Sequence, residues 1–418
     1  MEAIDLISHD LWPRISTAHI ANARIIKYGE AMRVLIGYSY ASNNRDAVAN
    51  AINDLARGLS EFGMQTVVYK RYDPYQERSQ PVPGTVAESL RKVNRLKGQL
   101  LYLAEFTVHL IRTASTIDCV ITLDTPSGIG FTGKLAKLVS RGRIKHVAWI
   151  MDLYRLQTHN QESRPANRLR DARLNFETAT IKSADRVVVL GECMRLELER
   201  IGIPRSVVLP IWHNASSKLP IPKPEAKAVY DRSNDFIVMY SGNAGIAHPL
   251  GGLVGAAEIL RQEEQIRFIV SGHGNSYDSA QKLAKKAGLE NIEFTTGVPF
   301  HELSFYLSSA DIHVVCLSEQ AVGSCVPSKA YGAMAAARPI LFLGSAGCQI
   351  ALDVNEAQCG YCTPTDEAQK IADIILSLYR QPNLLAQLGQ NSRLYFEDQR
   401  SLTTGVTRWS QMLKTITD

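Results

Sequence analysis

The stretch FIVMYSGNAG, residues 236–245, has the pattern of a buried strand that ends in a turn of small residues. A helical pattern follows, and RFIVSGHGN at 267–275 repeats the order of apolar strand and glycine turn. IEFTTGVP (292–299) and IHVVCL (312–317) supply two further strands, and VPSKAYGAMAAARPIL (326–341) closes the series. Strands that alternate with helices predict a parallel sheet with ligands at the carboxyl ends of its strands.

The first half of the chain shows the same kind of pattern. MRVLIGYSY (32–40) is a candidate opening strand, and residues 47–62 are a candidate helix. AWIMDLY (148–154) and SADRVVVLGECM (183–194) contain later strands. A chain of 418 residues is long enough for two domains of ordinary size, so we predict the α/β class.

The order of these pieces resembles the donor-binding domain of GT-B glycosyltransferases, in particular glycosyltransferase family 4. The matching segments are the turn at 242–245, the turn at 272–274, the strand at 292–297, the segment 310–317 and the segment 335–339. The resemblance implies two Rossmann-like domains that face each other across a cleft. It also implies a retaining sugar transfer from a UDP- or GDP-sugar, with no metal and no further cofactor.

The resemblance suggests where the domains begin and end. Residues 1–31 match nothing in the family and are expected to be an N-terminal extension. The acceptor-side domain is expected at 32–210, a proline-rich linker at 211–235 and the donor domain at 236–395. The last segment, 396–418, is expected to return to the first domain as a helix.

The two glycine turns are the expected donor site. Gly242 and Gly245 would let backbone N–H groups approach the diphosphate of a nucleotide sugar, because a strand-to-helix turn binds anionic oxygens without a specific side chain. Gly272 and Gly274 are expected to lie near the nucleotide base, although they could serve the turn alone.

The family's phosphate-binding cations are missing from their usual places. Asn243 and His248 stand where an arginine and a lysine are common; both can donate hydrogen bonds, but neither is a permanent cation. Lys329, which follows Ser328 in the V-P-S-K segment, is the best replacement, with Arg338 as a second candidate. A surface lysine is the alternative interpretation of Lys329.

Both family glutamates are also absent. Ser324 occupies the place of the glutamate beside the donor sugar, and Gly332 that of the glutamate that holds the ribose hydroxyls. A glycine side chain accepts no hydrogen bond, so ribose recognition must come from elsewhere. If only that contact has been lost, a glutamate at 332 would restore it, provided the pocket has room.

The acceptor side offers two aspartates and one loop. Asp124, in ITLDTPSG, and Asp152, in WIMDLY, each follow an apolar strand and are the candidate catalytic residues; each could instead cap the next helix. The acceptor-side loop is expected to consist of Ser42, Asn43, Asn44 and Arg45.

Charge and cysteine usage bear on location. Residues 1–210 hold 29 Lys and Arg against 21 Asp and Glu, a net of +8, whereas residues 211–418 have a net of −3. The basic first domain is either a solvated surface or a contact with an anionic membrane; no nucleic-acid motif accompanies the charge. Seven cysteines, an odd number, fit a reducing compartment, so we expect a cytoplasmic protein, with a contact at the inner face of the membrane as the open alternative.

Two functions follow from the residues and the resemblance. The first is a hexosyltransferase-type enzyme of polysaccharide biosynthesis, which moves a sugar to a polysaccharide, lipid-linked or small-molecule acceptor. The second is a catalytically inactive partner subunit with the same fold, which the missing glutamates favour.

Overall fold

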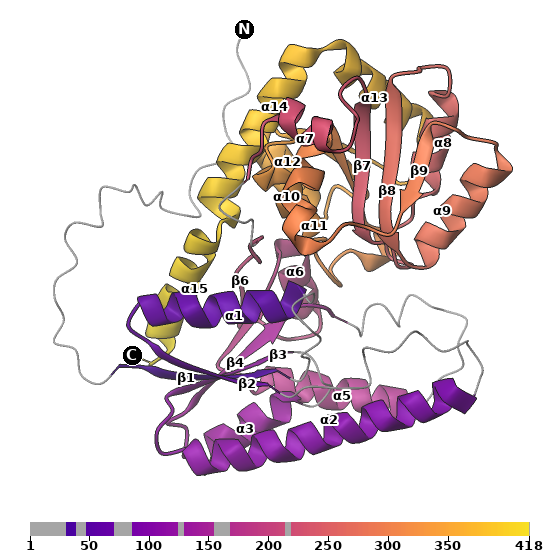
Figure 1. The fold of residues 1–418 in the computed structure, drawn as a ribbon. Helices are drawn as coiled ribbons and strands as arrows, with labels where there is room; N and C mark the ends of the chain where they lie inside the picture. Colours follow the sequence, from indigo (N-terminus) through magenta and orange to yellow (C-terminus); the bar gives the residue numbers. More distant parts are fainter. Residues whose placement is uncertain are drawn as a thin grey trace, which may run out of the picture.

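The computed structural model describes residues 31–38, 47–70, 86–123, 129–153, 168–213 and 219–417. Within them the chain forms two six-stranded sheets with helices packed against them (Figure 1). Every strand pair in both sheets is parallel. The predicted α/β fold with two Rossmann-like units is confirmed.

The first sheet takes its strands from the first half of the chain. Its elements are β1 Arg33–Tyr38, α1 Ala47–Glu61, β2 Gln65–Lys70, α2 Val86–Thr113, β3 Cys119–Leu123, α3 Ile129–Val139, β4 Lys145–Ile150, α5 Arg168–Lys182, β5 Arg186–Val189, α6 Glu192–Arg200 and β6 Ser206–Val208. All five residues of β3, CVITL, are buried. Strands covered on both faces read as continuous apolar runs, which is why the alternating pattern of a half-exposed strand is missing.

The second sheet contains the motifs that dominate the sequence. Its elements are β7 Phe236–Asn243, α8 Gly251–Ile259, β8 Ile266–His273, α9 Asn275–Lys286, β9 Ile292–Thr295, η2 Phe300–Glu302, α10 Leu303–Ser309, β10 Ile312–Cys316, η3 Glu319–Ala321, α11 Lys329–Ala335, β11 Ile340–Leu343, α12 Gln349–Ala357, β12 Gly360–Thr363, α13 Ala368–Arg380, α14 Pro382–Tyr395 and η4 Phe396–Arg400. The order of strands and helices follows the sequence pattern.

Each sheet reverses its direction of growth once. The strand orders are β2-β1-β3-β4-β5-β6 and β12-β11-β10-β7-β8-β9. In the second sheet the chain therefore grows outward from β7 to β9 and then returns to place β10 on the other side of β7. The carboxyl ends of β7 and β10 flank this switch point, the position where open α/β sheets bind their ligands.

The segment predicted as a linker contains a helix, α7 Lys223–Val229. Pro224 fits its first turn, because the missing proline N–H has no intrahelical partner there. The Nζ atoms of Lys223 and Lys227 lie 2.7 Å from the two carboxylate oxygens of Asp311, which fastens α7 to the second sheet. The proline-rich segment therefore contains a short helix that the sequence pattern did not predict.

The last helix, α15 Leu402–Thr417, lies against α1 of the first sheet (Figure 1). A Cβ atom at Gly58 would lie 2.6 Å from Val406, so the two helices approach closely. Trp409 on α15 packs edge-on against Trp149 of β4, with ring centroids 4.8 Å apart. In the described part of the chain, no helix combines the length and apolarity needed to cross a bilayer.

Candidate functional site

The two glycine turns of the predicted donor site pack directly against each other. Gly242 pairs with Gly272 at the ends of β7 and β8. A Cβ atom at Gly272 would lie 2.0 Å from the Gly242 carbonyl oxygen, and one at Gly274 would lie 2.6 Å from that of Ala244. Gly242, Gly272 and Gly274 also have φ values of 129°, 142° and 120°, where side chains are strained. The close approach of the turns therefore requires these glycines.

Lys329 lies over the first of these turns. Its ammonium donates a hydrogen bond to the Asn243 carbonyl oxygen at 2.9 Å and another to the Tyr240 hydroxyl. Its Cε would be 3.5 Å from a Cβ atom at Gly242. The side chain is half-buried, and this burial lowers the pKa of Lys329 to about 8. Lys329 is thus a positioned cation at the switch point, which argues against the surface interpretation.

Tyr240 was not identified from the sequence. It is the last fully buried residue of β7, and its hydroxyl donates to the Asn243 carbonyl oxygen at 2.8 Å. The Lys329 ammonium also lies 4.2 Å from the centre of its ring, a cation–π distance. The available signal was an aromatic residue with a polar hydroxyl at the end of the apolar run FIVMY.

His248 faces β10 rather than presenting a donor to the turn. Its Nδ1 lies 2.7 Å from the Cys316 carbonyl oxygen, so Nδ1 carries the proton that is donated. Burial, and then the charge of Lys329, lowers the pKa of His248 to about 4. The neutral ring therefore has an acceptor at Nε2. The backbone N–H of His248 donates to the Gly245 carbonyl oxygen at 2.9 Å and closes the turn.

Ser324 and Asp152 come together where the two halves of the chain meet. The Ser324 hydroxyl donates to the Ala321 carbonyl oxygen at 2.6 Å, and the Ser324 carbonyl accepts the Leu153 N–H at 2.6 Å. Burial, followed by the negative charge of Asp152, raises the pKa of Cys325 to about 12. Asp152 therefore lies near the segment that leads to Lys329. Ser324, fully buried, contributes a backbone contact between domains.

The position of the missing ribose glutamate is filled. Gly332 lies within α11, and a Cβ atom there would be 2.9 Å from Nε2 of His213. His213 belongs to the segment that follows β6, and burial lowers its pKa to about 4. A glutamate at 332 would therefore meet the side chain of His213, and the room that the expectation required exists only if that ring moves. Ser328 precedes α11 as its N-cap residue but makes no capping bond through its side chain.

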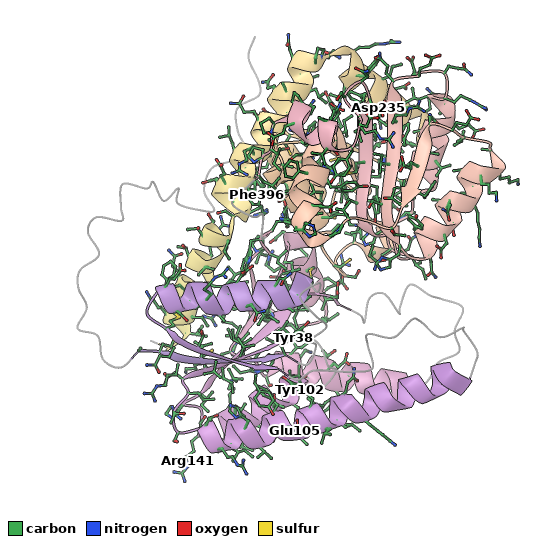
Figure 2. All side chains as sticks on the ribbon, in the orientation of Figure 1. Tyr38, Tyr102, Glu105, Arg141, Asp235 and Phe396 are labelled. Atoms are coloured by element: carbon green, nitrogen blue, oxygen red, sulfur yellow. The ribbon has the colours of Figure 1, made fainter. Side chains whose placement is uncertain are left out.

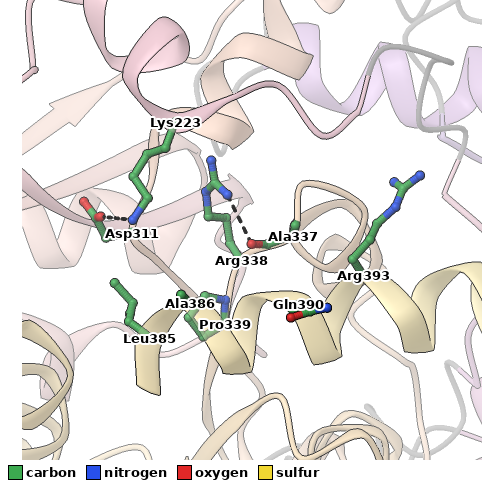
Figure 3. A pocket seen from close by; sticks show the side chains of 9 residues that line it. All are labelled: Lys223, Asp311, Ala337, Arg338, Pro339, Leu385, Ala386, Gln390 and Arg393. Carbon is green, nitrogen blue, oxygen red and sulfur yellow. Dashed lines mark hydrogen bonds and ion pairs between the residues drawn. The ribbon is translucent and has the colours of Figure 1, made fainter. Parts of the chain in front are cut away.

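Arg338, the second candidate for a phosphate cation, lies at the wrong edge of the sheet. It precedes β11, whereas the glycine turn follows β7, so the two are at opposite ends of parallel strands. Its guanidinium donates to the Ser308 carbonyl oxygen, with the Nη2 bond at 2.6 Å. It lines a separate pocket with Lys223 and Asp311, shown in Figure 3. Arg338 therefore cannot replace Lys329.

Some predicted site residues lie outside the described residues. They are Asp124, which follows β3, and the loop of Ser42, Asn43, Asn44 and Arg45, which follows β1. Among the residues that the structure does describe, no three His, Cys, Asp or Glu side chains are grouped to hold a metal ion. The site in view thus consists of the Gly242 turn, Lys329, Tyr240 and the neighbouring Asp152.

Comparisons with known proteins agree with this architecture. The family described as "Glycosyl transferase 4-like domain" matches residues 46–212, and "Glycosyl transferases group 1" matches residues 222–395. The chain has the GT-B fold and resembles glycosyltransferase family 4. The first match covers most of the first sheet, and the second match covers the second sheet.

Individual relatives match more narrowly. "Probable glycosyltransferase WbjE" of Pseudomonas aeruginosa is 29% identical over 197 residues, 46% of this chain and 49% of the relative. WcaI of Escherichia coli (strain K12), provisionally named a colanic acid biosynthesis glycosyl transferase, is 26% identical over 37% of this chain and 39% of its own. The chain thus matches about half the length of these relatives or less.

Solved structures show the same fold over nearly the whole chain. Sucrose-phosphate synthase from Thermosynechococcus elongatus superposes with a TM-score of 0.70 at 17% identity, covering 92% of this chain and 99% of that one. Anabaena HepE in complex with UDP gives 0.67 at 13% identity, covering 92% and 100%. At such identities the similarity establishes the GT-B fold.

Proposed function

We propose that this protein is a retaining glycosyltransferase that moves a sugar from a nucleoside-diphosphate sugar to a polysaccharide, lipid-linked or small-molecule acceptor. The observation that carries the proposal is the cation of Lys329, held over the Gly242 turn at the switch point. The crystal structures of HepE with UDP and with UDP-glucose support a nucleotide-sugar donor for a protein of this fold. The name of WcaI supports a role in polysaccharide biosynthesis.

The residues suggest how transfer would be assisted. Lys329 would stabilise the charge that develops on the departing diphosphate, together with backbone N–H groups of the turn. Because the lysine is already fastened by Tyr240 and Asn243, little reorganisation is needed when the charge appears. Asp152, beside the Ser324 segment, is suited to accept a hydrogen bond from the acceptor hydroxyl. A hexosyl donor and a position at the inner face of the membrane remain parts of this proposal.

The second candidate function is an inactive partner subunit. It is favoured by one observation, namely that His213 fills the space beside Gly332 where the family's ribose-binding carboxylate would begin. Such a protein would keep the fold and recruit or stabilise an active transferase. Both candidate functions allow nucleotide binding, so an activity measurement is also needed to distinguish the enzyme from the inactive subunit.

The deciding experiment combines calorimetry with a hydrolysis assay. UDP and GDP are titrated into the protein in excess EDTA, and we expect binding without a divalent metal. Slow hydrolysis of the matching UDP- or GDP-sugar, lost in Lys329→Met, would support catalysis. Binding that appears only when Mg²⁺ or Mn²⁺ is restored would refute the metal-free donor site. Tight binding without any hydrolysis or transfer would favour the partner subunit.

A further inference from the structure

A cavity of about 350 Å³ lies in the second domain, away from the candidate donor site. It is bounded by α7, by α14 and by the segment 337–339, which joins α11 to β11 (Figure 3). Because Asp311 precedes β10 and Pro339 precedes β11, the cavity lies at the amino edge of the sheet, whereas the Gly242 turn lies at the carboxyl edge. Small-molecule sites have volumes of about 300–1,000 Å³, so this cavity has room for a small ligand.

Cationic side chains from three elements line this cavity. Lys223 comes from α7, Arg338 from the segment before β11, and Arg393 from α14. Figure 3 shows Arg338 between the other two, with α14 below it. Leu385 gives the wall an apolar side chain, and Gln390 adds an exposed amide, which can both donate and accept hydrogen bonds. The lining thus combines positive charge with groups that suit the carbon and hydroxyl parts of an organic molecule.

The carboxylates that pair with these cations do not balance their charge. Asp311 also lines the cavity, but each of its two oxygens is already paired at 2.7 Å, one with Lys223 and the other with Lys227. Nε of Arg393 lies 2.7 Å from a carboxylate oxygen of Glu397. When the central arginine is added, the lining cations and their described ion-pair partners comprise four cations and two carboxylates. An excess of two positive charges therefore remains at the cavity.

Arg338 is buried, and in the described part of the chain it forms no ion pair. Its guanidinium donates to the Ser308 carbonyl oxygen at 2.6 and 3.2 Å and to the Ala337 carbonyl oxygen at 3.1 Å. These bonds hold the side chain and use three of its five N–H groups, but they neutralise no charge. Burial lowers the pKa of Arg338 to about 10, an effect that the charge of Asp311 partly offsets. The group is thus still a cation at neutral pH, and a buried charge is normally paired.

Arg393 is oriented by its neighbours on the other side of the cavity. Its Nη1 donates to the Ala335 carbonyl oxygen at 2.8 Å, and its guanidinium carbon lies 5.6 Å from the centre of the Phe396 ring, a residue labelled in Figure 2. A side chain that is already ordered loses little entropy when it binds a ligand. Its partner Glu397 is 53% exposed, and such a solvent-exposed ion pair contributes little free energy. An anion in the cavity could therefore share this guanidinium at small cost.

We propose that this cavity is a second anion site, which binds the phosphate monoester of a small molecule such as a hexose phosphate. A phosphate monoester carries a charge of about −1.5 to −2 at neutral pH, which matches the excess of two cations better than a single carboxylate does. The planar guanidinium of Arg338 suits two phosphate oxygens at once, and Lys223 supplies a point charge. Leu385 and Gln390 would contact the organic part. This site is additional to the proposed transferase site and does not depend on it.

The test is isothermal titration calorimetry of the full-length protein with glucose 6-phosphate. Wild type is expected to bind this ester more tightly than inorganic phosphate, and to show no binding of glucose. Arg338→Gln should weaken binding of the ester about tenfold or more, because it removes a charge-assisted hydrogen bond. Arg393→Gln should act in the same direction, and it decides the matter if Arg338→Gln does not fold. Arg380→Gln on α13, a 65% exposed arginine side chain that does not line the cavity, is the matched control and should bind as wild type.

Three outcomes would overturn the proposal. They are failure of wild type to bind glucose 6-phosphate at millimolar concentration, equal affinity for the ester and for inorganic phosphate, or unchanged affinity for the ester in the folded cavity variants. A reciprocal comparison keeps the cavity separate from the donor site. Lys329→Met should bind glucose 6-phosphate as wild type does, and Arg338→Gln should bind UDP or GDP as wild type does. Binding of the ester by a protein that binds no nucleotide would refute only the donor site.

Discussion

Replacing Lys329 by methionine tests the donor site most directly. Methionine retains most of the side-chain volume but removes the ammonium that reaches the Asn243 carbonyl and the Tyr240 hydroxyl. A hydrogen bond to a charged group contributes about 1.5–3 kcal/mol, so the nucleoside diphosphate should bind about 13- to 160-fold more weakly. The fold should remain intact, because the aliphatic stem over Gly242 is preserved.

The pH dependence of binding gives an independent signature. Burial lowers the pKa of Lys329 to about 8, from an ordinary value of 10.5. In the free protein the lysine is therefore charged below pH 8 and loses its proton above it. A bound diphosphate favours the charged form, so binding above pH 8 takes up a proton and the affinity falls by up to about tenfold per pH unit. Affinity should change little with pH just below 8.

Isothermal titration calorimetry between pH 7 and 9.5 measures both effects. The Lys329→Met variant should lose the part of the pH dependence that comes from the lysine. Any change of affinity with pH that remains in this variant measures titration of the nucleotide itself. Lys223→Met is the matched control, because Lys223 lies at the opposite edge of the second sheet and should leave affinity unchanged. Equal affinity of wild type and Lys329→Met, or the same slope above pH 8 in both, would refute the role of Lys329.

Three further changes test the surroundings. Tyr240→Phe removes the hydroxyl that fastens Lys329 and should weaken nucleotide binding by about 0.5–1.5 kcal/mol in calorimetry; an unchanged affinity would deny that Tyr240 positions the lysine. Gly332→Glu should lower the free energy of unfolding in urea by about 1–3 kcal/mol through collision with His213, and should not tighten nucleotide binding; a tighter complex would show that the pocket has room. Ala337 has a φ of 56° after α11, so Ala337→Gly should raise the free energy of unfolding by about 0.5–1 kcal/mol, whereas a lower midpoint in urea would contradict the strain.

The fold could be predicted from the sequence because its signals are local. FIVMY and, after Arg267, FIVS are strand segments buried on both faces, and their glycine turns require backbone angles that other residues rarely adopt. The helix expected at 47–62 is α1, and the C-terminal helix is α15. The short helix α7 was not predicted, because Pro222 and Pro224 gave its segment the pattern of a linker.

Only some residues of the candidate site could be predicted from the sequence. Lys329 could be singled out because its segment resembles a family motif, and the structure places it over the Gly242 turn. Arg338 looked equivalent in the sequence, yet lies at the other end of the strands. Tyr240 acquires a role only because its hydroxyl meets a lysine 89 residues away.

The sequence by itself determined the order of strands and helices, the parallel sheets and the glycine turns, because these depend on apolar patterning and backbone freedom within a few residues. Only the tertiary structure decided which side chains meet. It brought Lys329 to Tyr240, set Asp152 beside the Ser324 segment and placed His213 against Gly332. Such contacts join residues far apart in the chain, and their geometry is fixed by how strands and helices pack, which local patterns do not encode.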